Sequence, residues 1–254
     1  MGAGLKTLPP REQKASAVRR MFDAIAPRYD LLNHLLSLNQ DRRWRRIAVE
    51  RLLQHRPAPG WFLDACAGTL DLGLALARQP AFRGRIAASD FALAMLRTGA
   101  HKATTAPIDP VCADALRLPF VDATFEAALV GFGVRNLADL DDGLRELARV
   151  VKPGAPLVVL EFTTPTWPPF RSLYLFYFRR VLPWLGRLVS RHRSAYAYLP
   201  ASVLEFPAPA ALADRMRAAG FRDVEWETLT GGIVAVHAGI RGQGSGIREP
   251  IAAP

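Results

Sequence analysis

The sequence has few cysteines and no long apolar run, and each shortage excludes a class of protein. Cys66 and Cys112, the two cysteines in 254 residues, form neither the disulfide framework of a small secreted domain nor a metal-ligand pattern. No uncharged apolar run reaches the roughly 18 residues that a membrane-spanning helix needs. The start, MGAGLKTLPPREQ, lacks the apolar core of a signal peptide. We therefore expect a cytoplasmic protein without a metal centre.

Acidic residues are missing from one long segment, residues 170–200, although the chain carries a net charge of +10. This window contains six arginines among aromatic and aliphatic side chains: Arg171, Arg179, Arg180, Arg187, Arg191 and Arg193. Such a patch attracts the phosphate groups of nucleic acid or anionic lipid. Its composition is typical of a helix that lies in the membrane interface, kinked at Pro183. We expect peripheral contact with an anionic membrane through residues 170–193; the alternative is an amphipathic helix packed on the sheet.

The pattern from Trp61 onward predicts an α/β fold. Strand-like runs alternate with helical runs, which favours a parallel sheet with right-handed crossovers. The expected strands of this part are 61–66, 84–90, 109–114, 125–132 and 155–162. After a helical run at 209–220, strand patterns at 221–230 and 231–240 meet at a Gly–Gly pair and predict an antiparallel hairpin.

The domain organisation follows from the same pattern. We expect one domain over residues 16–240, which is large enough to bury a sizeable core. Within it, residues 16–56 are expected to form a helical cap, and 165–205 an insertion that faces substrate or membrane. Residues 1–15 are expected to be a flexible arm and 241–254 a disordered tail.

Glycine is scarce in the loop after the first expected strand, LDACAGTLDL at residues 63–72. The glycine pattern of a dinucleotide loop and the G-K-[ST] of a phosphate loop are both absent, so the ligand need not carry a pyrophosphate. S-adenosylmethionine is such a ligand. The residues fit the acidic-x-G-x-G-x-G loop of class I methyltransferases, with Asp64 in the acidic place, Gly68 closest to the ligand, and Cys66 and Leu70 replacing the outer glycines. The alternative is an ordinary strand-to-helix turn.

Acidic residues at the ends of the next strands support a cofactor site. Asp90 ends the second strand, about twenty residues after the loop, where a carboxylate accepts hydrogen bonds from ribose hydroxyls. Asp114 ends the third strand, where it and the N–H of Ala115 can bind the adenine edge. A lone Asp at a strand end is more often a helix cap. Three acids in register after successive strands, with Asp64 the first, predict binding of S-adenosylmethionine.

Five longer motifs carry a resemblance to a known family over Val18 to Gly239. They are FDAIAPRYDLLNHLLSL, LPFVDATFEAALVGFGVRN, LARVVKPGAPLVVLEF, SAYAYLPASV and AGFRDVEWETLTGGIVAVHAG. The chain resembles the ubiquinone/menaquinone biosynthesis C-methyltransferases. This resemblance implies a class I, Rossmann-like fold: a mostly parallel seven-stranded sheet with a C-terminal antiparallel hairpin and an N-terminal helical extension.

The resemblance also implies a reaction and its contacts. The expected reaction is methyl transfer from S-adenosylmethionine to a ring carbon of a polyprenyl quinol, demethylmenaquinol to menaquinol, with the corresponding step of ubiquinone biosynthesis as the alternative. The implied cofactor contacts are Thr69, Asp90, Asp114, Ala115 and Gly131. The chain departs from the family at Leu70 and Asn39, where glycine is frequent; Asn tolerates the left-handed conformation that glycine would supply.

The chemistry of methylating a ring carbon suggests the catalytic residues. The sulfonium methyl is already activated, but the carbon becomes nucleophilic when a quinol hydroxyl ionises, and a fixed cation favours that ionisation. Arg135, in the loop after the fourth strand, is the candidate cation, and a surface salt bridge is its alternative role. Asn136 beside it could orient the ring oxygen. The candidate bases are His237, otherwise a core residue, and His34. Candidates for lining or closing the substrate pocket are Tyr29, Asp30, Tyr196 and Tyr198.

The sequence supports two rival functions less well than the methylation of a quinol. Methyltransferases that act on a flipped base carry an [NDS]-P-P-[YFW] turn after the fourth strand. Here WPPF, at Trp167–Phe170, follows the fifth strand and begins with Trp, so we expect no nucleic-acid partner. A non-catalytic, cofactor-binding subunit of a quinone-synthesis complex is the other rival, and the presence of both cofactor and substrate motifs argues against it. A homodimer is compatible with the sequence.

Overall fold

The chain folds around a seven-stranded sheet with strand order β3-β2-β1-β4-β5-β7-β6. The computed structural model describes residues 9, 11–177, 180 and 193–243, with side chains for all except 11–12 and 193–197. The strands are β1 (Gly60–Ala65), β2 (Gly84–Asp90), β3 (Ile108–Cys112), β4 (Ala127–Gly131), β5 (Pro156–Phe162), β6 (Phe221–Leu229) and β7 (Val234–Arg241). β1 to β5 run parallel, and β7 is antiparallel to both of its neighbours, which confirms the predicted hairpin.

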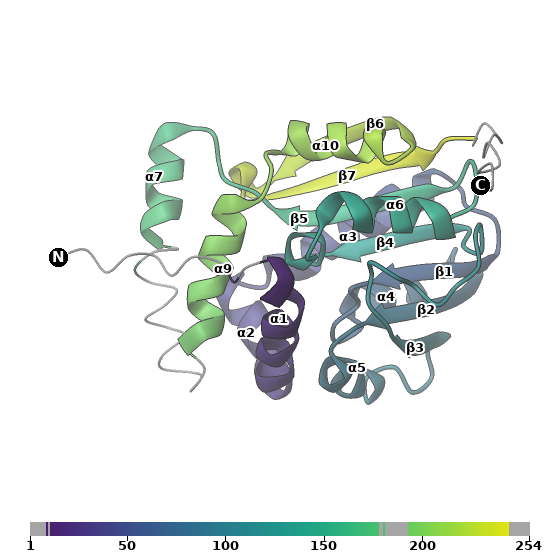
Figure 1. Ribbon diagram of the computed structural model, residues 1–254, viewed down its shortest axis with the longest axis horizontal. Helices are drawn as coiled ribbons and strands as arrows, with labels where there is room; N and C mark the ends of the chain where they lie inside the picture. Colours follow the sequence, from purple (N-terminus) through teal and green to yellow (C-terminus); the bar gives the residue numbers. More distant parts are fainter. Residues whose placement is uncertain (1–8, 10, 178–179, 181–192, 244–254) are drawn as a thin grey trace, which may run out of the picture.

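Helices cover both faces of the sheet, and more helices gather at its carboxyl edge. The α-helices are α1 (Arg11–Ile25), α2 (Tyr29–Leu36), α3 (Gln40–Gln54), α4 (Asp71–Ala77), α5 (Leu93–Ala100), α6 (Leu140–Val150), α7 (Pro168–Phe176), α9 (Arg193–Glu205) and α10 (Pro209–Ala218). Short 3₁₀ turns are η1 (Ala26–Arg28), η2 (Val134–Asn136) and η4 (Thr230–Gly232). α6 and α10 pack on one face, and α3 and α4 on the other. In Figure 1, α1, α2, α7 and α9 lie at the end of the sheet opposite the C-terminus.

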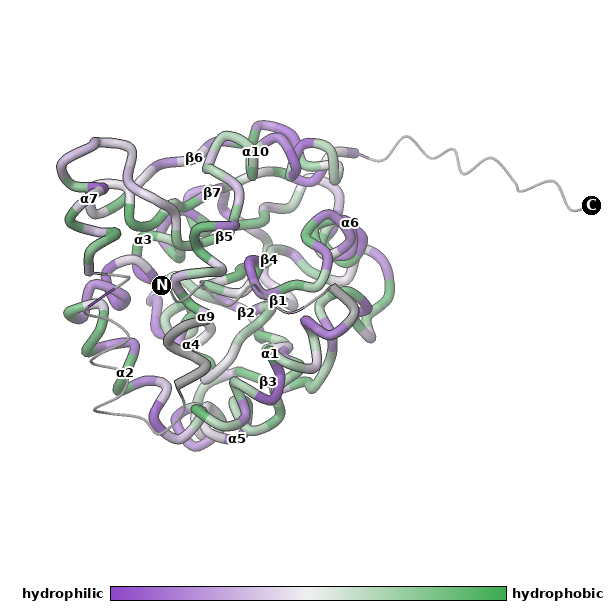
Figure 2. Tube along the Cα trace, turned by 60° about the vertical axis from the view of Figure 1, so that its left-hand side comes forward, coloured by the Kyte–Doolittle hydropathy of each residue, from purple (hydrophilic) through white to green (hydrophobic). Residues whose placement is uncertain are grey.

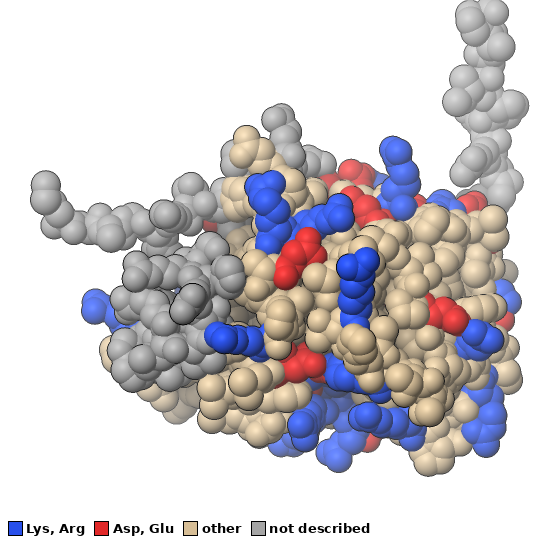
Figure 3. All heavy atoms as spheres, turned by 90° about the horizontal axis from the view of Figure 1, so that it is seen from below, with Lys and Arg blue, Asp and Glu red and all other residues tan. Residues whose placement is uncertain are grey.

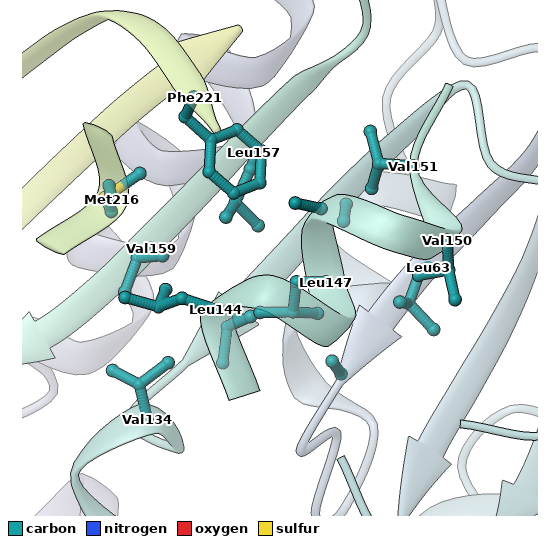
Figure 4. Packing of buried hydrophobic residues seen from close by; sticks show 14 of the residues in the cluster. Leu63, Val134, Leu144, Leu147, Val150, Val151, Leu157, Val159, Met216 and Phe221 are labelled. Atoms are coloured by element: carbon teal, nitrogen blue, oxygen red, sulfur yellow. The ribbon is translucent and has the colours of Figure 1, made fainter. Parts of the chain in front are cut away.

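The core is densely apolar because the central strands are covered on both faces. β5 has six consecutive buried residues, as expected for a parallel strand between two helical layers. On one face, Leu144 and Leu147 of α6 pack with Val159 and Phe221 (Figure 4). This packing holds the strand ends in place, and the site is built on them.

The N-terminal helical pattern is divided into α1, α2 and α3 by two short breaks. The second break ends at Asn39, which has φ 60° and ψ 10°, the left-handed conformation expected there. α1 begins at Arg11, so the flexible arm expected through residue 15 is too long. Lys14 Nζ donates to the carbonyl oxygens of Arg135 and Leu137, at 3.0 and 2.7 Å, and ties the start of α1 to the loop after β4.

The C-terminal tail and the expected insertion at 165–205 fall only partly within the described residues. β7 continues through Arg241, and the rest of the tail, 244–254, lies outside them. The expected insertion contains α7 and α9, whereas the predicted kink at Pro183 and three of the six arginines, Arg179, Arg187 and Arg191, lie outside the described residues. No helix in the described ranges is both long and apolar enough to cross a bilayer.

Candidate active site

The loop after β1 has the conformation of a glycine loop with a single glycine in it. Cys66, Gly68 and Leu70 have φ values of 54°, 53° and 67°. The left-handed region costs a residue with a side chain roughly 1–2 kcal/mol. Leu70 is fully buried against the sheet, so its packing offsets this strain. Cys66 and Leu70 therefore adopt the left-handed conformation without being glycines.

Asp64 lies beneath this loop and not in a cavity. Its Oδ2 accepts a hydrogen bond of 2.8 Å from the N–H of Gly73, in the first turn of α4. Its Oδ1 has no hydrogen-bond partner among the described residues, and burial raises the pKa of the carboxyl to about 7. The structure thus places Asp64 outside the small cavity, where its carboxylate supports the start of α4, and a direct cofactor contact at Asp64 stays a prediction.

A small cavity at the carboxyl edge collects most of the predicted cofactor residues. It is lined by Gly68, Asp90, Asp114, Ala115 and Gly131. Asp90 is 8 % exposed, and its carboxylate accepts hydrogen bonds from the N–H groups of Gly68 and Ala92, at 2.9 and 2.8 Å. Burial raises the pKa of Asp90, and these two backbone hydrogen bonds oppose the rise. An oriented carboxylate here fits a ribose diol, and the neighbouring pair Asp114–Ala115 fits an adenine edge.

Helix α1 closes this cavity from outside. Ala15 and Phe22 of α1 line the cavity, and the volume of the cavity is about 50 Å³. Sites for drug-sized ligands enclose about 300–1,000 Å³. The small cavity is below this range.

Thr69 and Asp30 meet each other and do not line the small cavity. The hydroxyl of Thr69 donates to Asp30 Oδ1 at 2.5 Å. Lys102, which follows α5, bridges Asp30 and Asp71 with Nζ–O distances of 2.6 and 2.5 Å. These contacts tie α2 to the cofactor loop. The part played by Lys102 had no signal in the sequence, because its partners are 31 and 72 residues away.

A second, larger cavity of about 610 Å³ lies beside the first. Its walls are mainly apolar and come from α1, α2 and α7. Of the predicted site residues, Tyr29, Arg135 and Tyr198 line it. Phe22, Tyr29 and Phe132 line both cavities, so the two spaces share a wall.

Arg135 lies in η2 with its guanidinium held at the wall of the larger cavity. It is 8 % exposed, and its Nη1 donates to Glu161 Oε1 at 2.7 Å and to the carbonyl of Phe132 at 2.5 Å. The guanidinium carbon lies 5.3 Å from the centre of the Phe162 ring. Its Nε is buried without a hydrogen-bond partner among the described residues. Glu161, 1 % exposed, was missed in the sequence, although a carboxylate in the hydrophobic run of β5 was the signal.

Asn136 and Tyr198 connect the two cavities. Asn136 lines the small cavity, and its Oδ1 accepts a hydrogen bond of 3.1 Å from the hydroxyl of Tyr198. Its Nδ2 donates to the carbonyl of Phe132 at 3.2 Å. Burial raises the pKa of Tyr198 to about 12. The side chain of Tyr196 lies outside the described residues.

The two candidate bases have different surroundings. His237 is 1 % exposed on the α10 face of the sheet, where its Nε2 lies 2.9 Å from the carbonyl oxygen of Pro209. Burial lowers its pKa to about 4, and it lines neither cavity, so the structure corrects this assignment to a core residue. His34 Nδ1 lies 2.8 Å from Asp41 Oδ2, and Asp41, which also pairs with Arg45, lines the larger cavity.

The sheet order and the acidic strand ends define a class I S-adenosylmethionine-dependent methyltransferase fold. The cyclase SpnF matches 96 % of this chain and 100 % of its own at a TM-score of 0.66 and 18 % identity. An S-adenosylmethionine-dependent methyltransferase from Thermotoga maritima, a possible histamine N-methyltransferase, matches 87 % of this chain and 99 % of its own. The TM-score is 0.59 and the sequence identity is 17 %. Such low identities show the fold alone. Residues 10–241 match the ubiE/COQ5 methyltransferase family, and the chain belongs to that family.

Curated relatives agree along nearly their whole length. The demethylmenaquinone methyltransferase of Streptomyces avermitilis is 45 % identical over 230 residues, which cover 91 % of this chain and 96 % of the relative. The ubiquinone/menaquinone biosynthesis C-methyltransferase UbiE of Geobacter sp. is 45 % identical over 233 residues, 90 % of this chain and 98 % of the relative. The cofactor of this family is S-adenosylmethionine. The residues around the small cavity fit this cofactor.

Proposed function

We propose that the chain transfers a methyl group from S-adenosylmethionine to a ring carbon of a polyprenyl quinol, converting demethylmenaquinol to menaquinol. The observation that carries this proposal is the large apolar cavity that shares a wall with the small cavity and contains Arg135. Its apolar walls suit a ring that bears a prenyl tail. The Streptomyces relative bears the name of this reaction.

The small cavity is the proposed cofactor site. Asp90 binds the ribose hydroxyls and Asp114 with the N–H of Ala115 binds adenine, while Gly68 lets the backbone approach closely. The bound cofactor supplies an electrophilic methyl group. The contribution of the chain is orientation, and holding reactants in line can lower a barrier by about 7–11 kcal/mol.

Arg135 is proposed to stabilise the ionised quinol oxygen. Its unpartnered Nε is a donor at the cavity wall, while Glu161 compensates the burial of its charge. Asn136 and Tyr198 orient the ring. With its pKa raised to about 12, Tyr198 keeps its proton at neutral pH and acts as a hydrogen-bond donor, not as the base.

Two further predictions accompany this function. The first is contact with an anionic membrane from the cytoplasmic side through residues 170–193, because the substrate is a lipid. The second is methylation of the corresponding benzoquinol, since the Geobacter relative is named for both pathways.

The test is methyl transfer from labelled cofactor, offered in parallel to demethylmenaquinol, to the benzoquinol and to RNA. We expect label in the naphthoquinol and none in RNA. Label in RNA would establish the nucleic-acid rival. Cofactor binding without transfer to either quinol would indicate a non-catalytic subunit.

A further inference from the structure

Helix α2 and the turn after it expose a stripe of leucines. Leu31, Leu35 and Leu38 are 61, 49 and 80 % exposed. Leu31 and Leu35 are four residues apart, which places them along one side of the helix, and Leu38 follows in the turn after it. The neighbouring Leu32 is buried, so the stripe is the outer side of an element whose inner side is already packed.

Helix α7 exposes a second apolar stripe, and the end of this helix contacts the end of α2. Leu173 and Phe176 are 62 and 60 % exposed and lie three residues apart. The hydroxyl of Tyr177, directly after α7, donates to the carbonyl of Leu36 at the end of α2, at 3.2 Å. Figures 1 and 2 both place α2 and α7 on the side of the molecule opposite the C-terminus.

These stripes form the rim of the larger cavity. Leu35, Leu38 and Leu173 line the cavity and are exposed at the same time, so they stand where the cavity meets the outside. We call the five residues of the two stripes the apolar mouth. Several exposed apolar side chains near the opening of a cavity are typical of an interaction site.

Charge selects among the partners that could cover the apolar mouth. The segments that form it, 31–40 and 163–177, contain no Asp or Glu. Exposed arginines flank it: Arg42, Arg43, Arg171 and Arg180. On the face shown in Figure 3, basic side chains are also spread more widely than acidic ones. Exposed apolar residues with exposed arginines next to them in the sequence match a bilayer with anionic headgroups. A two-fold dimer through the same mouth would bring like charges together.

We propose that the apolar mouth docks into an anionic lipid bilayer, so that a quinol enters the larger cavity directly from the hydrocarbon. The inference rests on the proposed function for the identity of the quinol, and on the exposed residues for the docking. It assigns the contact to α2 and α7, and does not depend on the arginines outside the described residues. A lipid path suits the exposed leucines that line the opening.

The decisive variant combines Leu31→Glu and Phe176→Glu. Both residues are exposed and neither lines the cavity, so the substitutions change the docking surface alone. The matched control is Val121→Glu, because Val121 is 78 % exposed and lies in the loop before β4, outside the apolar mouth. Vesicles of phosphatidylglycerol and phosphatidylcholine, without quinol, are sedimented with each protein. We expect binding to fall about tenfold or more in the double variant and to stay unchanged in the control.

Other outcomes overturn the docking. No binding of the parent protein, or equal binding of the parent and the double variant, would refute it. Size-exclusion chromatography without vesicles would refute it in a different way if the double variant turned a dimer into a monomer, since the mouth would then be a subunit interface. If thermal melting shows that the double variant does not fold, Leu31→Glu alone is used under the same criteria.

An activity assay separates this inference from the proposed function. Each protein receives demethylmenaquinol in vesicles and, separately, a short-chain analogue in water. We expect the double variant to lose about tenfold or more of its rate on vesicles and to keep its rate on the analogue, and equal losses on both would contradict a docking role. Failure of the parent protein to methylate either quinol would refute the proposed function, while the sedimentation result would still decide the docking.

Discussion

The two cavities of this methyltransferase differ in origin, although they share a wall. The small one is built from the ends of β1 to β4, with two carboxylates and backbone groups, and has a volume of about 50 Å³. The large one is built mostly from helices added around the sheet, is apolar and has about 610 Å³. A shared sheet fold does not by itself determine the reaction. The proposed cofactor site thus belongs to the sheet edge, and the proposed substrate site belongs to the added helices.

The largest expected effect is a loss of cofactor affinity from a substitution in the small cavity alone. Asp90→Ala removes the carboxylate proposed to bind both ribose hydroxyls, so we expect cofactor affinity to fall about a hundredfold or more. Titration calorimetry on the folded variant measures this. Asp114→Ala is the comparison and should lose less, because the N–H of Ala115 remains. Unchanged affinity in Asp90→Ala would contradict the proposed cofactor site.

The next effect belongs to the large cavity. Removing the positive charge of Arg135 should lower the rate of methyl transfer about a hundredfold, as loss of a preorganised donor does, with little change in cofactor affinity. Arg135→Ala alone would leave the buried Glu161 unpaired and cost about 3–5 kcal/mol of stability. The double variant Arg135→Gln/Glu161→Gln avoids this. Single-turnover kinetics at several pH values test it; a normal rate with weaker cofactor binding would assign Arg135 to the other cavity.

A smaller effect is expected where the cavities are joined. Tyr198→Phe removes the hydrogen bond to Asn136 and should reduce kcat/KM about fivefold, the value of one such bond. A double-mutant cycle with Asn136→Ala checks the coupling. Additive losses would show that the two residues act independently, and the cavities would then be connected only by packing.

The smallest effect on activity is expected at His237, which belongs to neither cavity. His237→Gln should leave the rate unchanged and alter how stability depends on pH. Its pKa is about 4 in the folded protein, whereas the unfolded chain binds the proton near 6.5. Acid therefore favours unfolding as pH falls from 6.5 towards 4, by at most about 3 kcal/mol.

Urea denaturation of both proteins at pH 7, 6, 5 and 4.5 measures this dependence. The opposite contribution of Asp64, whose raised pKa makes stability fall as pH rises towards 7, is present in both proteins and cancels in the difference. Parallel stability curves for the parent protein and His237→Gln would contradict a neutral buried histidine. A large loss of rate would restore it as a candidate base.

The sequence predicted the part of the site that depends on strand ends. Hydrophobic runs located the strands, and parallel strands end at one edge, so Asp90 and Asp114 had to lie near each other. The left-handed conformation of Asn39 was also predictable, because it depends on one residue type and one backbone conformation. These features arise from local periodicity and from a topology that applies to every sheet of this kind.

Only the tertiary structure decided which distant side chains pair with each other and in which direction each side chain points. Glu161 meets Arg135 across 26 residues and Asp30 meets Thr69 across 39, and no local pattern relates such positions. Asp64 and His237 have the spacing and chemistry of site residues, but their side chains lie on the faces of the sheet and are buried in the core. Cys66 and Leu70 keep a left-handed conformation without glycine because the packing around them is worth more than the local strain. Sequence thus determined where chemistry could gather, whereas burial and long-range contacts determined which side chains reach it.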